Sequence, residues 1–246
     1  MRHLVGRKRT TEVIQALKNG VIVSCQAPED SPINHPLVIS AMALVAEQQG
    51  AVAVRINGAR NIRAVRRRVK IPIIGIEKLR VPGCSVYITP HLASARRVLR
   101  AGADIIAMDF TGGQRPGGQS AGEIVQELKQ RSNVVVMADV ATLEQGRKAQ
   151  ELGADLVATT LFGYTETTKQ FCGPGFKLLR DLVRELSVPI ILEGRVRSAV
   201  DVQKGFDLGA HAIVAGTAVT DIEWLVRRLV AAVPRRRRGM ARVEVE

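Results

Sequence analysis

Aromatic residues, cysteines and histidines are scarce in this sequence. Aromatic side chains make up 3% of the 246 residues, which argues against a base-stacking surface of the type that binds single-stranded nucleic acid. Cys25, Cys84 and Cys172 are odd in number and share no spacing typical of metal ligands or of a disulfide framework. We therefore expect a protein of a reducing compartment, the cytoplasm.

Long apolar runs and cofactor motifs are also missing. No apolar run approaches the roughly 20 residues of a membrane span, and Leu4-Val5 is interrupted at once by charged residues instead of opening a signal peptide. The four histidines lie in predicted loops or at the start of an element and form no cluster with Cys or Asp. Neither a nicotinamide fingerprint nor a Walker loop occurs. We expect no membrane span, no metal and no cofactor.

Positive charge is abundant, with a formal net charge of +13. This balance favours anionic partners, such as phosphorylated metabolites, nucleic acid or lipid headgroups. We interpret most of it as a solvated basic face and a flexible tail. The basic residues gather in three clusters: Arg2, Arg7, Lys8 and Arg9; Arg60, Arg63, Arg66, Arg67, Arg68 and Lys70; and Arg235 to Arg238.

Short apolar runs alternate regularly with helical patterns. The predicted strands are 21–26, 51–55, 71–76, 105–108, 134–138, 156–158, 188–192 and 212–215, with a possible extra strand at 86–89. The predicted helices are 10–18, 36–49, 61–69, 92–99, 123–129, 143–152, 176–186, 200–208 and 222–232. The joints AGAD at 101–104, LGAD at 152–155 and LGAH at 208–211 each close a helix and open a strand.

Eight such repeats predict an α/β fold, a single-domain (β/α)8 TIM barrel of the phosphate-binding type, for which about 250 residues is the usual length. We place the barrel at residues 20–233, after an N-terminal helical segment, 1–19, and before a basic tail, 234–246.

Polar or glycine residues follow every predicted strand. The carboxyl ends of barrel strands meet at one face, where these enzymes place their active sites. The residues are Gln26, Arg55, Lys78, Asp109, Asp139, Thr160, Glu193 and Gly216.

Two glycines lie where such barrels commonly hold a phosphate. Gly194-Arg195 follows the seventh strand and Gly216-Thr217 the eighth, so the substrate is expected to carry a phosphate. Without metal or cofactor, acid and base chemistry on a phosphorylated small molecule means isomerisation, epimerisation, aldol cleavage or cyclisation. Lys78, desolvated at the mouth, would abstract a proton or form a Schiff base.

Eight motifs, spread over about residues 20–230, carry a family resemblance. They are VSCQA at 23–27, VRING at 54–58, IIGIEK at 73–78, YITP at 87–90, ADIIAMD at 103–109, MADVATL at 137–143, TTLFGYT at 159–165 and EGR at 193–195. In this order they resemble the N-acylglucosamine-6-phosphate 2-epimerase family. Its enzymes interconvert N-acetylmannosamine 6-phosphate and N-acetylglucosamine 6-phosphate, in amino-sugar and N-acetylneuraminate degradation.

The resemblance implies a role for each matching residue. Lys78 would remove and return the C2 proton, with Glu193 tuning that lysine or managing protons on substrate oxygens. The phosphorylated N-acyl amino sugar would be the partner, and a homodimer is possible. The implied substrate-binding residues are Gln26, Arg55, Asp139 and Tyr164, and the implied phosphate-binding residues are Gly194, Arg195, Gly216 and Thr217.

Three stretches depart from the family pattern. Leu79-Arg80-Val81 replaces the usual Arg-Asp-Tyr, Gly112-Gly113-Gln114 precedes the single Arg115, and Asp221 stands where an arginine is common. These departures concern loops and substrate affinity and leave Lys78 and Glu193 in place. Two alternatives stay open: another phosphate-binding barrel enzyme acting on a phosphorylated sugar, and a polyanion-binding protein that uses the basic tail.

Overall fold

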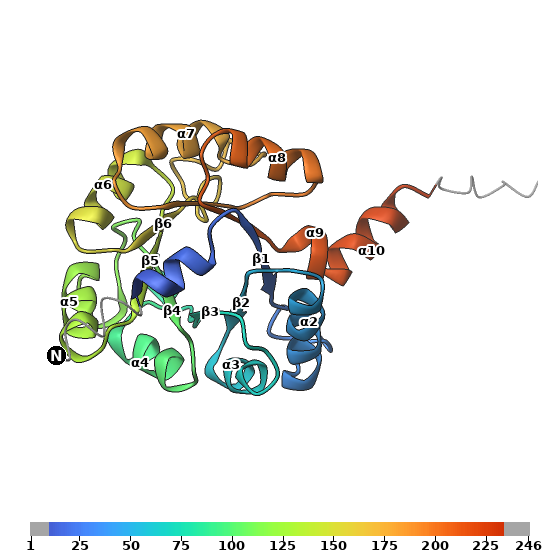
Figure 1. Cartoon of the computed structure of the whole chain (residues 1–246), viewed down its shortest axis with the longest axis horizontal. Helices are drawn as coiled ribbons and strands as arrows, with labels where there is room; N and C mark the ends of the chain where they lie inside the picture. Colours follow the sequence, from blue (N-terminus) through green and yellow to red (C-terminus); the bar gives the residue numbers. More distant parts are fainter. Residues whose placement is uncertain (1–9, 234–246) are drawn as a thin grey trace, which may run out of the picture.

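Eight parallel strands close into a barrel in a computed structural model that describes residues 10–233 (Figure 1). Each strand pairs with its neighbours in sequence, and β8 pairs with β1. The predicted (β/α)8 barrel is therefore confirmed. The strands are β1 (Gly20–Cys25), β2 (Ala53–Asn57), β3 (Ile73–Ile76), β4 (Ile105–Asp109), β5 (Val135–Asp139), β6 (Leu156–Ala158), β7 (Ile190–Glu193) and β8 (Ala212–Ala215).

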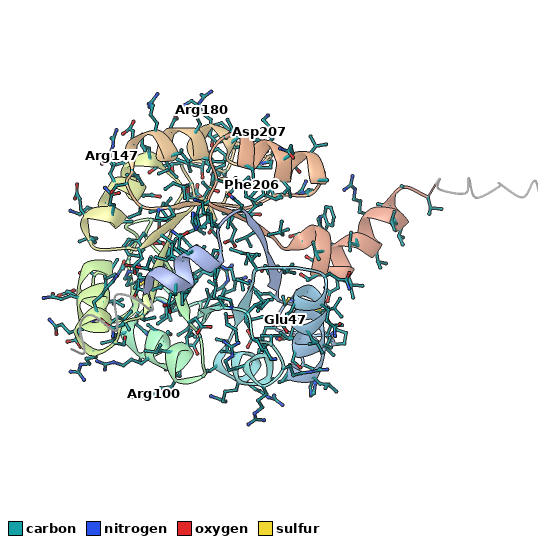
Figure 2. The ribbon with its side chains drawn as sticks, viewed as in Figure 1. Glu47, Arg100, Arg147, Arg180, Phe206 and Asp207 are labelled. Carbon is teal, nitrogen blue, oxygen red and sulfur yellow. The ribbon has the colours of Figure 1, made fainter. Side chains whose placement is uncertain are left out.

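Helices surround the barrel, and charged side chains such as Arg100, Arg147 and Arg180 point outward from them (Figure 2). Arg66 departs from the predicted solvated basic face, because its guanidinium binds the Asp104 carboxylate at 2.8 Å and the Val69 carbonyl at 2.6 Å. The helices are α2 (Pro36–Gln48), α3 (Ala59–Arg66), α4 (Leu92–Arg100), α5 (Ala121–Arg131), α6 (Leu143–Glu151), α7 (Phe176–Glu185), α8 (Ala199–Asp207), α9 (Thr217–Thr220) and α10 (Ile222–Ala231).

Alternation along each strand divides the apolar residues into two clusters. Ile22, Ile74 and Ile105 fill the barrel interior, whereas their neighbours Val23, Ile73 and Ile106 pack under the outer helices. Since successive side chains of a strand point to opposite faces, this parity also decides which polar residues enter the barrel.

The predicted helix-to-strand joints have a common backbone geometry. Gly102, Gly153 and Gly209 each have a positive φ, of 106°, 88° and 90°. Glycine adopts this conformation without the steric cost of a Cβ atom, so it ends the helix and turns the chain into the next strand.

The amino end of the barrel is covered by the N-terminal segment. Residues 10–16 are helical and cross this end of the barrel in Figure 1, where Leu17 joins the interior cluster and Val13 and Ile14 pack against it. Residues 1–9, with Arg2, Arg7, Lys8 and Arg9, lie outside the described residues, as does the tail from 234, with Arg235 to Arg238.

Three features differ from the predicted elements. The possible strand at 86–89 forms only a single antiparallel bridge, between Lys78 and Ile88, and the short elements α9 and η1 (Pro116–Gly118) lie in segments predicted as loops. The last helix, α10, points away from the barrel instead of packing on it (Figure 1). None of the helices in residues 10–233 is both long and apolar enough to cross a membrane.

Candidate active site

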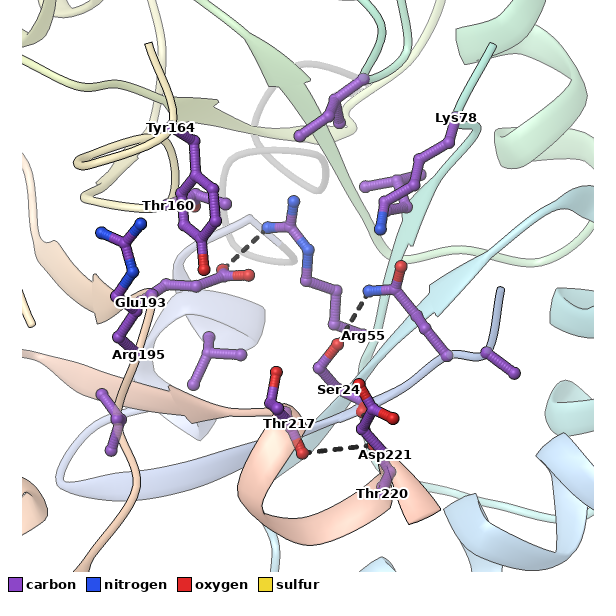
Figure 3. A pocket seen from close by; sticks show the side chains of 18 of the residues that line it. Ser24, Arg55, Lys78, Thr160, Tyr164, Glu193, Arg195, Thr217, Thr220 and Asp221 are labelled. Atoms are coloured by element: carbon purple, nitrogen blue, oxygen red, sulfur yellow. Dashed lines mark hydrogen bonds and ion pairs between the residues drawn. The ribbon is translucent and has the colours of Figure 1, made fainter. Parts of the chain in front are cut away.

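A pocket of about 330 Å³ opens at the carboxyl ends of the strands (Figure 3). Every predicted site residue except Asp139 lines it: Gln26, Arg55, Lys78, Tyr164, Glu193, Gly194, Arg195, Gly216 and Thr217. Asp139 is fully buried beneath them. Asp109, also expected at this rim, is not among the lining residues. Its carboxylate accepts hydrogen bonds from the N–H and the hydroxyl of Thr111.

Arg55 is the centre of a buried ion network at the floor of the pocket. Its guanidinium binds the Asp139 carboxylate at 2.6 and 3.1 Å and the Glu193 carboxylate at 2.9 Å. Arg55 is only 1% exposed. The alternation of side chains along each strand explains why Arg55, Asp139 and Glu193 meet. Each of them lies two positions after a residue that faces the barrel interior: Ala53, Met137 and Ile191.

Two threonines that follow β6 hold the Asp139 carboxylate and the Glu193 backbone in place. Thr160 donates its hydroxyl to Asp139 Oδ1 at 2.6 Å. The Thr159 hydroxyl donates to the Glu193 carbonyl at 2.8 Å and accepts from the Glu193 N–H at 3.0 Å. The backbone at the end of β7 is thereby held against β6, which leaves the Glu193 side chain a defined direction into the pocket.

The pKa of Glu193 is strongly displaced. Burial raises the pKa of its carboxyl to about 7, and the charge of Asp139 adds to this, while the charges of Arg55 and Lys78 oppose it. A carboxyl with this pKa exchanges protons near neutral pH, as a general acid or base requires.

Lys78 extends its ammonium into the pocket from the segment after β3 (Figure 3). Its backbone N–H donates to the Asn57 side-chain oxygen at 2.9 Å, and the Leu79 N–H donates to the Tyr87 carbonyl at 2.9 Å. Loss of solvent around the ammonium lowers the pKa of Lys78, and the charge of Arg55 lowers it further, against Glu193 and Asp139. The remainder of the residue stays exposed at the mouth of the pocket.

Two buried side-chain polar atoms in the described chain have no hydrogen-bond partner, and both belong to residues of this pocket. They are Gln26 Oε1 and Arg55 Nε. The Gln26 amide nitrogen donates to the Ser24 hydroxyl at 2.7 Å, which holds the side chain in place. Because a buried unpaired polar group costs about 1–3 kcal/mol, a ligand with matching hydroxyl or amide groups binds favourably here.

Sequence reasoning missed several residues of the site. Tyr87 and Ser24 line the pocket, as does Asp221, which the sequence marked only as a departure from the family pattern, and Asn57 holds the Lys78 backbone. Strand parity was a usable signal for Ser24, which follows the inward-facing Ile22. The position of Tyr87 depends on the bridge between Lys78 and Ile88, and the role of Asn57 depends on its hydrogen bond to the Lys78 N–H; no local sequence pattern encodes either contact. Within residues 10–233, no group of three His, Cys, Asp or Glu side chains is placed to hold a metal ion.

Comparison with known proteins identifies the family. The family model described as "Putative N-acetylmannosamine-6-phosphate epimerase" matches residues 39–235. A relative from Caldanaerobacter subterraneus subsp. tengcongensis, named "Putative N-acetylmannosamine-6-phosphate 2-epimerase", is 43% identical over 95% of this chain and 99% of its own length. One of the same name from Thermosynechococcus vestitus is 48% identical over 88% of this chain and 94% of its own length.

One solved structure supports this family, and another shares only the fold. The N-acetylmannosamine-6-phosphate 2-epimerase from Clostridium perfringens superposes with a TM-score of 0.86 at 35% identity, over 89% of this chain and 96% of that one. A thiamine phosphate pyrophosphorylase from Pyrococcus furiosus, at 15% identity, a TM-score of 0.57 and coverage of 89% and 98%, shares the fold alone. The chain therefore belongs to the N-acetylmannosamine-6-phosphate epimerase family.

Proposed function

We propose that this protein interconverts N-acetylmannosamine 6-phosphate and N-acetylglucosamine 6-phosphate by proton transfer at C2. The observation that carries the proposal is the joint placement of Lys78 and Glu193 in one pocket, with the pKa of the lysine lowered and that of the glutamate raised. Both groups exchange protons closer to neutral pH than ordinary side chains do. The reaction belongs to amino-sugar metabolism, and we extend the proposal to N-acetylneuraminate degradation in the cytoplasm.

The chemistry needs one base and a stabilised oxyanion. In the open-chain sugar the C2 proton is acidic because C2 is adjacent to the C1 carbonyl. The neutral Lys78 amine takes this proton, and the electrons of the broken C–H bond form an enolate with its charge on O1. The enolate then turns its opposite face toward Lys78, and the resulting ammonium returns a proton to that face of C2, which re-forms the C1 carbonyl and completes the inversion. Glu193 holds or moves protons on the sugar oxygens beside this centre.

The remaining residues bind the sugar. Gln26 Oε1 and Arg55 Nε, both unpaired, are available to the hydroxyl and N-acetyl groups. Tyr164 forms a wall of the pocket. Asp139 is buried and hydrogen-bonded to Arg55 and Thr160, so it acts by orienting Arg55.

The phosphate lies between the ends of β7 and β8. Gly194, Arg195, Gly216 and Thr217 line this side of the pocket. Gly194 has a φ of 101°, and a Cβ atom there would lie 3.3 Å from the Thr160 carbonyl oxygen, so glycine lets the chain turn close to the end of β6 and direct its backbone N–H groups toward an anion.

Turnover measured by NMR tests the proposal. Incubation with N-acetylmannosamine 6-phosphate is expected to produce N-acetylglucosamine 6-phosphate until equilibrium, while unphosphorylated N-acetylmannosamine is expected to react at least about 100-fold less efficiently in kcat/KM, because remote binding energy is lost. The absence of product from the phosphorylated sugar at high protein concentration would refute the function.

The pH profile of kcat/KM provides an independent prediction. Activity is expected to rise with pH as Lys78 loses its proton, with a midpoint below the ordinary lysine value of about 10.4. The negative charge of Glu193 raises the pKa of Lys78, so Glu193→Gln is expected to shift the rising limb of the pH profile to lower pH while reducing kcat. A limb that stays in place, or moves to higher pH, would contradict the coupling of these two groups.

We also propose a homodimer in which each subunit contributes α10 to its partner. The helix has no buried residue, and Ile222, Val226, Leu229 and Val230 leave it with an exposed apolar face at intervals of three and four residues. Beside α2 and β1 lies an apolar groove of about 790 Å³, whose lining includes Val38, Met42, Val45, Val52 and Val219. In a two-fold symmetric dimer the α10 of each subunit lies in the groove of the other, so that the apolar face of the helix and the apolar groove are both covered.

Sedimentation velocity tests this assembly. The protein is expected to sediment at twice the mass of the chain, and the double variant V226D/L229D at the mass of one chain. Arg227→Gln, a change on the same helix outside its apolar face, is expected to remain dimeric. A monomeric wild-type protein at micromolar concentration would contradict the proposal.

A further inference from the structure

The Arg195 guanidinium is directed at a loop instead of at the open pocket. Nη1 donates to the Phe171 carbonyl at 2.7 Å and to the Phe162 carbonyl at 3.4 Å, and Nη2 donates to the Gly163 carbonyl at 2.7 Å. These three acceptors belong to the segment between β6 and α7. Three of the five guanidinium N–H groups are thus engaged with main-chain oxygens of one loop.

One face of the same guanidinium is covered by Tyr164. The guanidinium carbon lies 4.2 Å from the centre of the tyrosine ring, in cation–π geometry. Tyr164 is 57% exposed and lines the pocket, and Figure 3 shows its ring between Arg195 and the cavity. Contact with Arg195 therefore fixes a residue that is otherwise largely surrounded by solvent.

The backbone conformations at Arg195 and at Gly163 both permit this contact. Arg195 has a φ of 58°, in the left-handed region that costs a non-glycine residue about 1 kcal/mol or more. In the loop, a Cβ atom on Gly163 would collide with Arg195 Nη1, so only glycine admits the guanidinium. The Gly163 N–H also donates to the Thr168 hydroxyl at 2.9 Å, and the Phe162 and Phe171 rings stack at 4.9 Å.

We propose that Arg195 is a positioning residue whose side chain holds the 161–172 loop and places Tyr164 as a wall of the sugar pocket. Arg195 then contributes to phosphate recognition through its backbone, beside Gly194, and not through its guanidinium. The inference deepens the proposed function and rests on it for the identity of the substrate. It separates the two roles of one residue: the main chain serves the phosphate, and the side chain serves the sugar.

Arg195→Lys distinguishes the two roles. Lysine keeps the positive charge, but it lacks the planar fork that reaches three carbonyls and stacks on a ring. We expect Arg195→Lys, Arg195→Ala and Tyr164→Ala each to raise KM about tenfold. The KM of the double variant R195A/Y164A is expected to exceed that of the worse single variant by no more than about twofold, because both substitutions remove the same contact. Inhibition by inorganic phosphate is expected to stay within about twofold of wild type. Arg197→Ala, an exposed arginine that stacks on Trp224 at 5.2 Å, is the matched charge control.

Hydrogen–deuterium exchange of the loop makes the test independent of turnover. In Arg195→Lys and Arg195→Ala, the amides of residues 161–172 are expected to exchange faster than in wild type, while those of Arg197→Ala are unchanged. Failure of the proposed function would appear as inactive wild-type protein with this exchange pattern intact. A near-normal KM for Arg195→Lys, together with a phosphate inhibition constant raised about tenfold in Arg195→Ala, would overturn the inference.

Discussion

Lys78→Met is expected to lower kcat by about 10³-fold or more, close to complete loss of activity. General acid–base groups typically contribute about 10²- to 10⁴-fold, and Lys78 supplies the only lysine amine among the described residues that line the pocket. Methionine keeps a side chain of similar length without a proton acceptor of comparable basicity. The measurement is kcat by NMR of the sugar C2 and anomeric signals.

The control for this variant is Lys148→Met. Lys148 lies on the outside of α6 with its side chain 64% exposed, so its replacement is expected to leave kcat unchanged. Circular dichroism of both variants verifies the fold. If Lys78→Met kept kcat within about tenfold of wild type, the base would have to be another group, and Glu193 would be the next candidate.

Arg55→Met is expected to lower the free energy of unfolding by about 3–5 kcal/mol, besides impairing catalysis. Removing one member of a buried ion network leaves its partners with uncompensated charge, and Asp139 and Glu193 are 0% and 8% exposed. The measurement is urea-induced unfolding, with Arg63→Met, on the outer surface of α3, as the exposed-arginine control.

The destabilisation by Arg55→Met depends on pH with a definite sign. Arg55 lowers the pKa of Glu193, so its removal moves that pKa further above the value in the unfolded chain. A raised folded-state pKa gives stability that is present at low pH and lost as the pH rises through it. The decrease in the free energy of unfolding caused by Arg55→Met is therefore expected to be larger at about pH 8.5 than at about pH 5.5. Adding Glu193→Gln to the Arg55→Met chain is expected to recover part of this decrease. A loss below about 1 kcal/mol at both pH values would show that the network contributes little.

The barrel and much of its floor follow from the sequence by simple rules. Apolar runs bounded by glycine and proline predict the strands, and the strand ends predict the rim. Parity then sends Arg55 and Glu193 inward, since each lies two residues after an interior position, Ala53 or Ile191. Local periodicity is sufficient here because the fold repeats one geometry eight times.

Features that depend on a single backbone angle or on distant contacts could not be predicted. Whether the Arg195 side chain faces the phosphate side or the loop is decided by its φ of 58° and by the space above Gly163. The direction of α10 depends on the turn at Asp221, whose carboxylate accepts from the Trp224 N–H at 2.9 Å. Its apolar pattern is the same whether it packs on its own barrel or on another subunit.

Proton transfer at C2 by Lys78 is the central claim, and deuterium labelling in D2O tests it most directly. An ammonium group carries three equivalent hydrogens, so even without exchange with solvent about two thirds of the returned hydrogens are expected to be deuterium, before isotope effects. With wild-type protein we expect N-acetylglucosamine 6-phosphate that is largely deuterated at C2, and with Lys78→Met neither product nor exchange at C2. Product that keeps protium at C2, or unchanged labelling with Lys78→Met, would contradict it.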